Sequence, residues 1–225
     1  MKADNESADS DEKGCYQSLA FCGKITASVT HELNNVLGTI DQVNGLIEDL
    51  IEFGTTDPEA LSDKLRLVSD KITKQIERGS RLIDRLNAFA HMSDHGIGAC
   101  DVKVLVENVT VLAQRLTGLR KVGLQASLPD DDVTIVTSPF HFAQMYFVVI
   151  CRILDVAMPD TVIEVRLSEA DESALIEVSA QSQENDKRVS EDIDIKVLTR
   201  HLSAEIEESC TEGHLDIRLR FPQRI

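Results

Sequence analysis

The chain has 225 residues, which is enough for one or two compact domains and excludes a large multidomain enzyme. Acidic residues outnumber basic ones by 39 to 23, and the formal net charge of −16 repels nucleic acid phosphates and anionic membrane surfaces. Aromatic residues make up only 4% of the chain and tryptophan is absent, so stacking platforms for bases or sugars are not expected. We therefore expect two compact parts with aliphatic cores and no nucleic acid or membrane partner.

The first residues, 1–16, are polar and acidic and contain no apolar stretch of the kind found in a secretory signal. We expect them to form a disordered lead. The five cysteines are scattered without a C-x-x-C pair, which indicates reduced, mostly buried thiols. Together these features predict a cytoplasmic protein. The uncharged run over residues 134–151 contains polar residues and a proline, so we interpret it as a buried helix rather than a membrane span.

Residues 17–92 carry the pattern of a long helical hairpin. From Val29 to Leu50, apolar residues recur at alternating spacings of four and three, which is a heptad pattern. The first helix is expected to end at Phe53, and Asp57-Pro58 provides a cap and a first-turn proline for the second helix. Two such helices leave apolar stripes uncovered, so we expect a homodimer whose hairpins form a four-helix bundle. The alternative is that the hairpin packs on the C-terminal half of its own chain.

The remaining sequence follows a different pattern. Residues 93–100 are a polar break that we expect to be a linker, and residues 101–225 alternate helical and strand-like segments. The expected fold class is α+β, with an N-terminal antiparallel helical hairpin and a C-terminal α/β sandwich whose helices cover one face of an antiparallel or mixed sheet. Helices are expected over 101–119, 139–157 and 191–207, and strands over 124–128, 133–137, 161–167, 174–180 and 215–221.

The pentapeptide His31-Glu32-Leu33-Asn34-Asn35 is the one group of residues with evident chemistry. The heptad pattern places His31 on the outer face of the bundle, with Asn35 one turn further along and Glu32 beside it. An imidazole is mostly neutral near pH 7, and a neighbouring carboxylate can orient one ring nitrogen while the other attacks an electrophile. The alternative is an exposed histidine without a role. A zinc motif of the type H-E-x-x-H is excluded because Asn35 occupies the second histidine position, so no metal site is expected.

This pentapeptide on the first arm of a long hairpin, followed by an α+β segment, resembles the dimerisation and histidine phosphotransfer domain of two-component sensor histidine kinases. The stretch from Asp101 through Leu128 and the segment SPFHFAQMYFVVICRILDVAM resemble the first half of the family's ATP-binding domain. Within that segment, Gln144 and Asp155 match commonly occupied positions of the family's N-box helix.

The departures from the family concern nucleotide binding. Val148 and Arg152 stand where the family has two asparagines that hold Mg²⁺ and nucleotide, and Gln181-Ser182-Gln183 replaces the D-x-G-x-G motif. No glycine occurs between Gly123 and Gly213, although a phosphate-cradling loop needs glycines for close backbone approach. We therefore expect residues 101–225 to be a degenerate kinase-like domain that binds no ATP, and we expect no cofactor on this chain.

The resemblance implies a phosphotransferase that relays phosphoryl groups between response-regulator receiver domains, with Mg²⁺ supplied by the receiver. In this interpretation His31 is the phosphoacceptor, Glu32 is an orienting acid or base, and Asn35 positions groups or supports receiver phosphatase activity. The alternatives are a receiver phosphatase and a non-catalytic dimeric scaffold or regulator of a kinase or receiver. An ATP-dependent histidine kinase is the least favoured function.

Residues 58–92 form the only net-positive segment, with seven basic and five acidic residues. Antiparallel pairing of the two helices places His31 near Ser80. Four cations then lie near the height of the histidine and are candidates for binding an acidic receiver face: Lys74, Arg78, Arg81 and Arg85. The alternative is a solvated helix face with intrahelical ion pairs.

Overall fold

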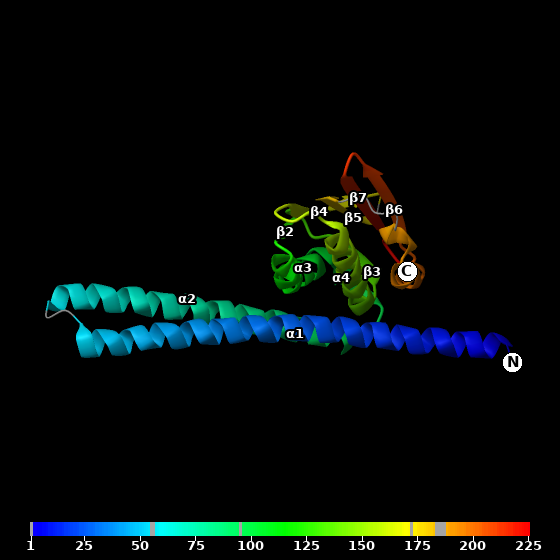
Figure 1. The fold of residues 1–225 in the computed structure, drawn as a ribbon. Coiled ribbons are helices and arrows are strands. Elements are labelled where there is room, and N and C mark those ends of the chain that lie inside the picture. Colours follow the sequence, from blue (N-terminus) through cyan, green and yellow to red (C-terminus); the bar gives the residue numbers. More distant parts are fainter. Residues whose placement is uncertain (1, 55–56, 95, 172, 183–187) are drawn as a thin grey trace. The chain divides into compact units, whose positions relative to one another are not determined.

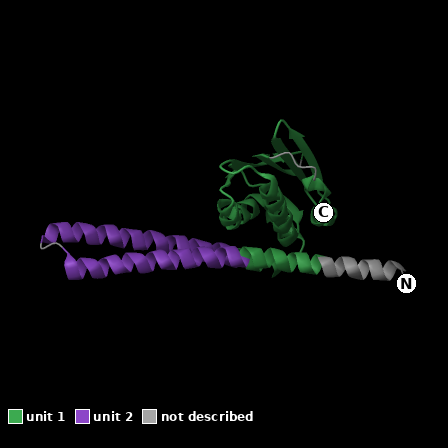
Figure 2. Ribbon diagram, in the orientation of Figure 1, with its two compact units in different colours: residues 1–25, 88–225 green, residues 26–87 purple. Residues whose placement is uncertain are grey.

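The computed structural model describes residues 2–54, 57–94, 96–171, 173–182 and 188–225, with side chains from residue 14 onward. The chain divides into two compact units (Figure 2). Unit 1 contains residues 1–25 together with residues 88–225, and unit 2 contains residues 26–87. The start of the first helix therefore belongs to the same unit as the α/β half of the chain.

Two long helices open the chain, α1 (Lys2–Phe53) and α2 (Pro58–Ala90) (Figure 1). The first begins at Lys2 rather than near residue 17, so helix replaces the disordered lead that was expected over residues 1–16; Met1 lies outside the described residues. Residues 2–13 contain no glycine or proline and are rich in acidic residues, which the positive end of a helix dipole favours. The expected cap of α2 is confirmed, because Asp57 Oδ1 accepts a hydrogen bond from the backbone nitrogen of Glu59 at 3.0 Å.

The two helices of unit 2 pack along the expected heptad seam. Val29, Val36 and Val43 are buried on α1, and Val68 is buried on α2. A Cβ atom placed on Gly79 would lie 3.4 Å from Cγ1 of Val36, in ordinary van der Waals contact across the two helices. The hairpin also leaves large apolar side chains exposed. These are Leu37, Leu46, Ile51, Phe53, Leu65, Leu67, Ile76 and Ile83.

The α/β part of unit 1 contains a mixed five-stranded sheet in the order β2-β4-β5-β7-β6. Strands β2 and β4 are parallel, and the other neighbours are antiparallel. Along β7, buried Leu215, Ile217, Leu219 and Phe221 alternate with more exposed residues, so one face of the sheet forms the core. The strands are β2 (Gly123–Ser127), β4 (Val162–Ala170), β5 (Ser173–Gln181), β6 (Glu205–Thr211) and β7 (His214–Pro222).

Three helices pack in this part of the chain, α3 (Val102–Leu119), α4 (Pro139–Val156) and α5 (Ile193–His201) (Figure 1). The expected α+β fold class is therefore confirmed. A separate antiparallel pair joins β1 (Gly98–Asp101) to β3 (Thr134–Thr137), and short 3₁₀ turns occur at η1 (His91–Asp94) and η2 (Val189–Glu191).

Two expectations about this half are wrong. The segment expected to be a linker, residues 93–100, includes the end of η1 and most of β1, whose small and polar residues give no strand pattern in the sequence. The helix expected over 191–207 ends at His201, and β6 follows it. The cause is a tight turn in which Glu212 and Gly213 both adopt positive φ, at 52° and 77°, so that β6 returns alongside β7.

Helix α4 is the core helix of unit 1. It is the one described helix that is long and apolar enough to cross a membrane, but 61% of that window is buried inside the fold, in agreement with the expected buried helix. Phe147 of α4 contacts Phe21 of α1 at a ring centroid distance of 5.1 Å, and Phe21 also contacts Phe89 and Phe140. These rings attach the first part of α1 to the α/β core.

The described cysteines are free thiols, of which two are exposed and three are partly buried, so the expectation of mostly buried thiols is wrong.

Candidate functional site

The three polar residues singled out in the sequence lie together on the outer face of α1 in unit 2. His31 is exposed, and the Nδ2 atom of Asn35 lies 3.3 Å from its Nδ1 atom. The same Nδ2 atom donates to Oε1 of Glu32 at 3.3 Å. This grouping follows from helical spacing, because residues three and four positions apart share one face. The imidazole is therefore presented to solvent with an amide and a carboxylate linked to it.

The hydrogen bonds around Asn35 define the state of the imidazole ring. An amide nitrogen can only donate, so Nδ1 of His31 acts as the acceptor and a neutral ring carries its proton on Nε2. This assignment follows from the network, since the negative Glu32 favours the amide nitrogen on its side. Turning the amide over would let its oxygen accept from a protonated Nδ1. The lone pair of Nε2 would then be free to attack an electrophile.

An ion pair across the hairpin fixes Glu32. Nη2 of Arg78 lies 2.7 Å from Oε2 of Glu32, which joins α2 to α1 one residue from His31 along the chain. This contact confirms the expected alignment of the two antiparallel helices, in which Arg78 lies at the height of His31. The Arg78 side chain is 53% exposed and the Glu32 side chain is 19% exposed, so solvent screening limits the pair to about 1 kcal/mol or less. Its main effect is to hold the carboxylate in place and to put a cation near the imidazole.

The other predicted cations lie on α2 on either side of Arg78. Lys74 and Arg81 are exposed, and Arg85 is half-buried and engaged in a further interaction. Their spacings of four, three and four residues place them on one side of the helix with Arg78. The sequence indicated this stripe, but it did not indicate that Glu32 would take Arg78 as its partner across the hairpin. The sequence signal that could have identified this ion pair is the presence of opposite charges at matching heights on the two antiparallel helices.

In unit 1, Arg152 occupies the α4 position where the resemblance expects a nucleotide-binding asparagine. Its Nε atom lies 2.7 Å from Oδ2 of Asp192, in an ion pair without the alignment of a hydrogen bond. Its Nη2 and Nη1 atoms lie 3.7 Å from Asp194 and 3.8 Å from Asp155. Burial raises the pKa of Asp194, Asp192 adds to that rise, and Arg152 opposes it. The guanidinium thus lies among three carboxylates of its own chain.

Sequence reasoning missed the two acids that hold Arg152. Asp192 and Asp194 flank the start of α5, where Asp192 also caps the helix by accepting from the backbone nitrogen of Asp194 at 2.9 Å. The capping pattern was visible in the sequence, but the approach of this helix end to α4 was not. Of the residues that replace the D-x-G-x-G motif, Gln181 is the last residue of β5 and Ser182 follows it. Gln183 lies outside the described residues.

Comparisons with known proteins define the fold. No protein-family model and no curated protein matches this sequence. The nucleotide-free catalytic domain of the histidine kinase ThkA aligns with a TM-score of 0.51 and 9% identity, over 58% of this chain and 97% of that domain. The complex of ThkA with the response regulator TrrA aligns with a TM-score of 0.50 and 14% identity, over 96% of this chain and 66% of that chain. The chain therefore has the fold of a histidine kinase core, with a helical hairpin followed by an ATPase-like α/β domain.

Proposed function

We propose that this chain is a histidine phosphotransfer protein that relays phosphoryl groups between response-regulator receiver domains through a phosphohistidine at His31. The observation that carries the proposal is the exposed imidazole of His31, linked to Asn35 and through it to Glu32. The fold supports it, since a solved structure that shares this fold is a histidine kinase in complex with a response regulator.

The reaction requires a free lone pair on His31. Nε2 attacks the phosphorus of the receiver's aspartyl phosphate, the N–P bond forms, and the P–O bond to the aspartate breaks with that carboxylate as leaving group. For this attack the proton lies on Nδ1, so the Asn35 amide has to turn its oxygen toward the ring and give up the hydrogen bond that its nitrogen donates to Glu32. The reverse sequence passes the phosphoryl group to a second receiver. Phosphoryl transfer depends mainly on in-line positioning and charge neutralisation, which the receiver's own Mg²⁺ supplies, so this chain needs no cofactor.

The cations of α2 suit an acidic partner surface. Arg78 shares its charge with Glu32, whereas Lys74 and Arg81 are exposed one turn away on either side. In a chain with a net charge of −16, these residues give the face beside His31 a local positive potential. We propose that they steer the receiver toward the histidine, together with Arg85. Association should then slow as the salt concentration rises.

The proposed relay does not involve ATP. Val148 and Arg152 lack the amides of the family's nucleotide site, and the Arg152 guanidinium is already paired with Asp192 and Asp194. We also propose that the protein is a cytoplasmic homodimer. A second copy would cover apolar side chains of the hairpin such as Leu37 and Ile76, which are 61% and 54% exposed.

Transfer of a radioactive phosphoryl group from a panel of phosphorylated receivers tests the relay. Wild-type protein should become labelled and His31→Gln should not, whereas His91→Gln, which alters another exposed histidine, should be labelled like wild type. Absence of label from every phosphorylated receiver would refute the proposal. Label acquired from ATP alone would establish a kinase instead.

Receiver dephosphorylation is the second candidate function, and the position of Asn35 beside the imidazole favours it. An amide at this place can orient a water molecule toward the receiver's aspartyl phosphate. Asn35→Ala should then slow phosphate release from the receiver while His31 still accepts label.

A scaffold without phosphoryl transfer would behave differently, because His31→Gln would keep biological activity and Ile40→Asp, which charges the hairpin's apolar side, would lose it.

A further inference from the structure

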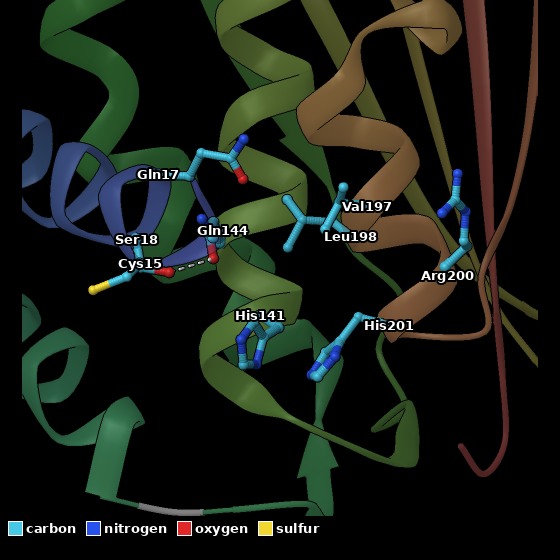
Figure 3. A pocket seen from close by; sticks show the side chains of 10 residues that line it. Cys15, Gln17, Ser18, His141, Gln144, Val197, Leu198, Arg200 and His201 are labelled. Carbon is cyan, nitrogen blue, oxygen red and sulfur yellow. Dashed lines mark hydrogen bonds between the residues drawn. The ribbon is translucent and has the colours of Figure 1, made fainter. Parts of the chain in front are cut away.

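Unit 1 contains a cleft of about 590 Å³ between the first part of α1 and helices α4 and α5 (Figure 3). This volume is in the range of small-molecule sites. Its polar side chains come from all three helices, with Gln17 and Ser18 on α1, His141 and Gln144 on α4, and Arg200 and His201 on α5. The cleft lies at the first turns of α4, before the position of Arg152, and it contains none of the residues around His31.

The described lining of the cleft differs in charge from the rest of the chain. The two histidines can become cations, and no described residue that lines the cleft is a carboxylate. Arg200 also lines the cleft, but its side chain extends away from the two imidazoles in Figure 3. The carboxylate of Asp194 lies close by but is already engaged, because it accepts from the Gln17 side chain and pairs with Arg152.

Gln144 brings a side-chain amide to the cleft. Its side chain is only 2% exposed, and its Oε1 atom accepts from Oγ of Ser18 at 3.4 Å, the bond drawn in Figure 3. Its Nε2 atom belongs to a side chain that lines the cleft, and an amide nitrogen can donate a hydrogen bond to an oxygen atom of a ligand there.

The two histidines place further donors beside this amide. Their ring centroids are 4.2 Å apart with an angle of 50° between the planes, and Nδ1 of His141 lies 2.9 Å from Oγ of Ser138. Burial lowers the pKa of His141, and the neighbouring His201 lowers it further. The other described ionisable residues that line the cleft with His141 are Arg200 on α5 and Cys15 on α1. The η1 turn also packs on α4.

We propose that this cleft binds a small oxyanion, a phosphate or carboxylate group, through the amide of Gln144 and the imidazoles of His141 and His201. Each of these groups donates hydrogen bonds, and a negative ligand between the rings removes the repulsion that their protonation creates. Affinity therefore rises as the pH falls and the imidazoles become charged. The ligand reaches the protein at a place separate from His31, so the site adds a small-molecule input to the proposed relay and does not depend on it.

Titration calorimetry on the full chain at constant ionic strength tests this site, with inorganic phosphate and malonate as the two probes. Saturable binding of at least one probe is expected, tighter at about pH 6 than at about pH 8. Saturation by phosphate alone identifies a phosphate site, and saturation by malonate alone identifies a carboxylate site. Gln144→Met removes the buried donor, and His201→Gln changes an exposed residue that the fold does not need. Both should weaken binding at least tenfold.

The control His214→Gln, an exposed histidine at the start of β7, should bind like wild type. Absence of saturable binding at either pH would overturn the proposal. Equal affinity in wild type, His201→Gln and His214→Gln would also overturn it, because the anion would then be held by general surface charge. His31→Gln should bind the probes unchanged, so failure of this site is distinguishable from failure of the relay.

Discussion

Phe21 should be one of the side chains that contribute most to the stability of unit 1. It is only 3% exposed and contacts Phe147, Phe89 and Phe140 at centroid distances of 5.1, 5.2 and 5.7 Å. A buried phenylalanine removes about 200 Å² from water, which corresponds to about 5 kcal/mol at roughly 25 cal/mol per Å². Alanine retains the Cβ atom, so we expect Phe21→Ala to lower the free energy of unfolding by about 4 kcal/mol, within the range measured for such changes.

Urea denaturation followed by circular dichroism measures this loss. With a denaturant slope of about 2 kcal/mol per M, the midpoint of the transition that reports unit 1 should fall by about 2 M. Leu19→Ala is the matched control, because Leu19 lies on the same helix two residues earlier and is 62% exposed. It should change the free energy by less than about 0.5 kcal/mol. A loss in Phe21→Ala no larger than in Leu19→Ala would refute the packing of α1 on α4.

Three further outcomes are expected from stability measurements. Gly79→Ala should raise the melting temperature, since it adds up to about 1 kcal/mol of helix propensity and its Cβ fits at 3.4 Å from Val36, whereas Gly79→Leu should lower it. Gly213→Ala should cost about 1 kcal/mol in urea denaturation, because its φ of 77° strains any residue with a Cβ. Since burial lowers the pKa of His141, the unfolded chain binds more protons below about pH 6.5, so stability should fall on acidification, and His141→Gln should reduce that fall.

Local pattern predicted most of the fold correctly. The heptad from Val29 to Leu50 and the alternation over residues 215–221 identified their elements, because burial of one face imposes a period on the sequence. The failures occurred where the structure depends on distant partners. Residues 205–211 contain three glutamates and little apolar alternation, and they form a strand because β7 offers a free edge after the turn at Gly213. Strand β1 likewise depends on its pairing with β3.

The candidate site was predictable in part for the same reason. His31, Glu32 and Asn35 lie within two turns of one helix, so their grouping follows from helical geometry alone. The partner of Glu32 on α2 depends on the register of the two helices of the hairpin. From the sequence this register can be predicted only approximately, by counting residues back from the short connection near residues 54–57. The cleft around Gln144 joins residues more than 120 positions apart in the chain, and no local pattern brings Ser18 to α4.

The ion pairs of Arg152 have a consequence for how such a domain can change over evolutionary time. Placing an asparagine at this position would leave the carboxylates of Asp192 and Asp194 without their cation, at 2.7 and 3.7 Å from a side chain that could no longer neutralise them. This single substitution would therefore cost stability. Since one guanidinium serves both acids, the arginine and the two aspartates can change without that cost only if they change together.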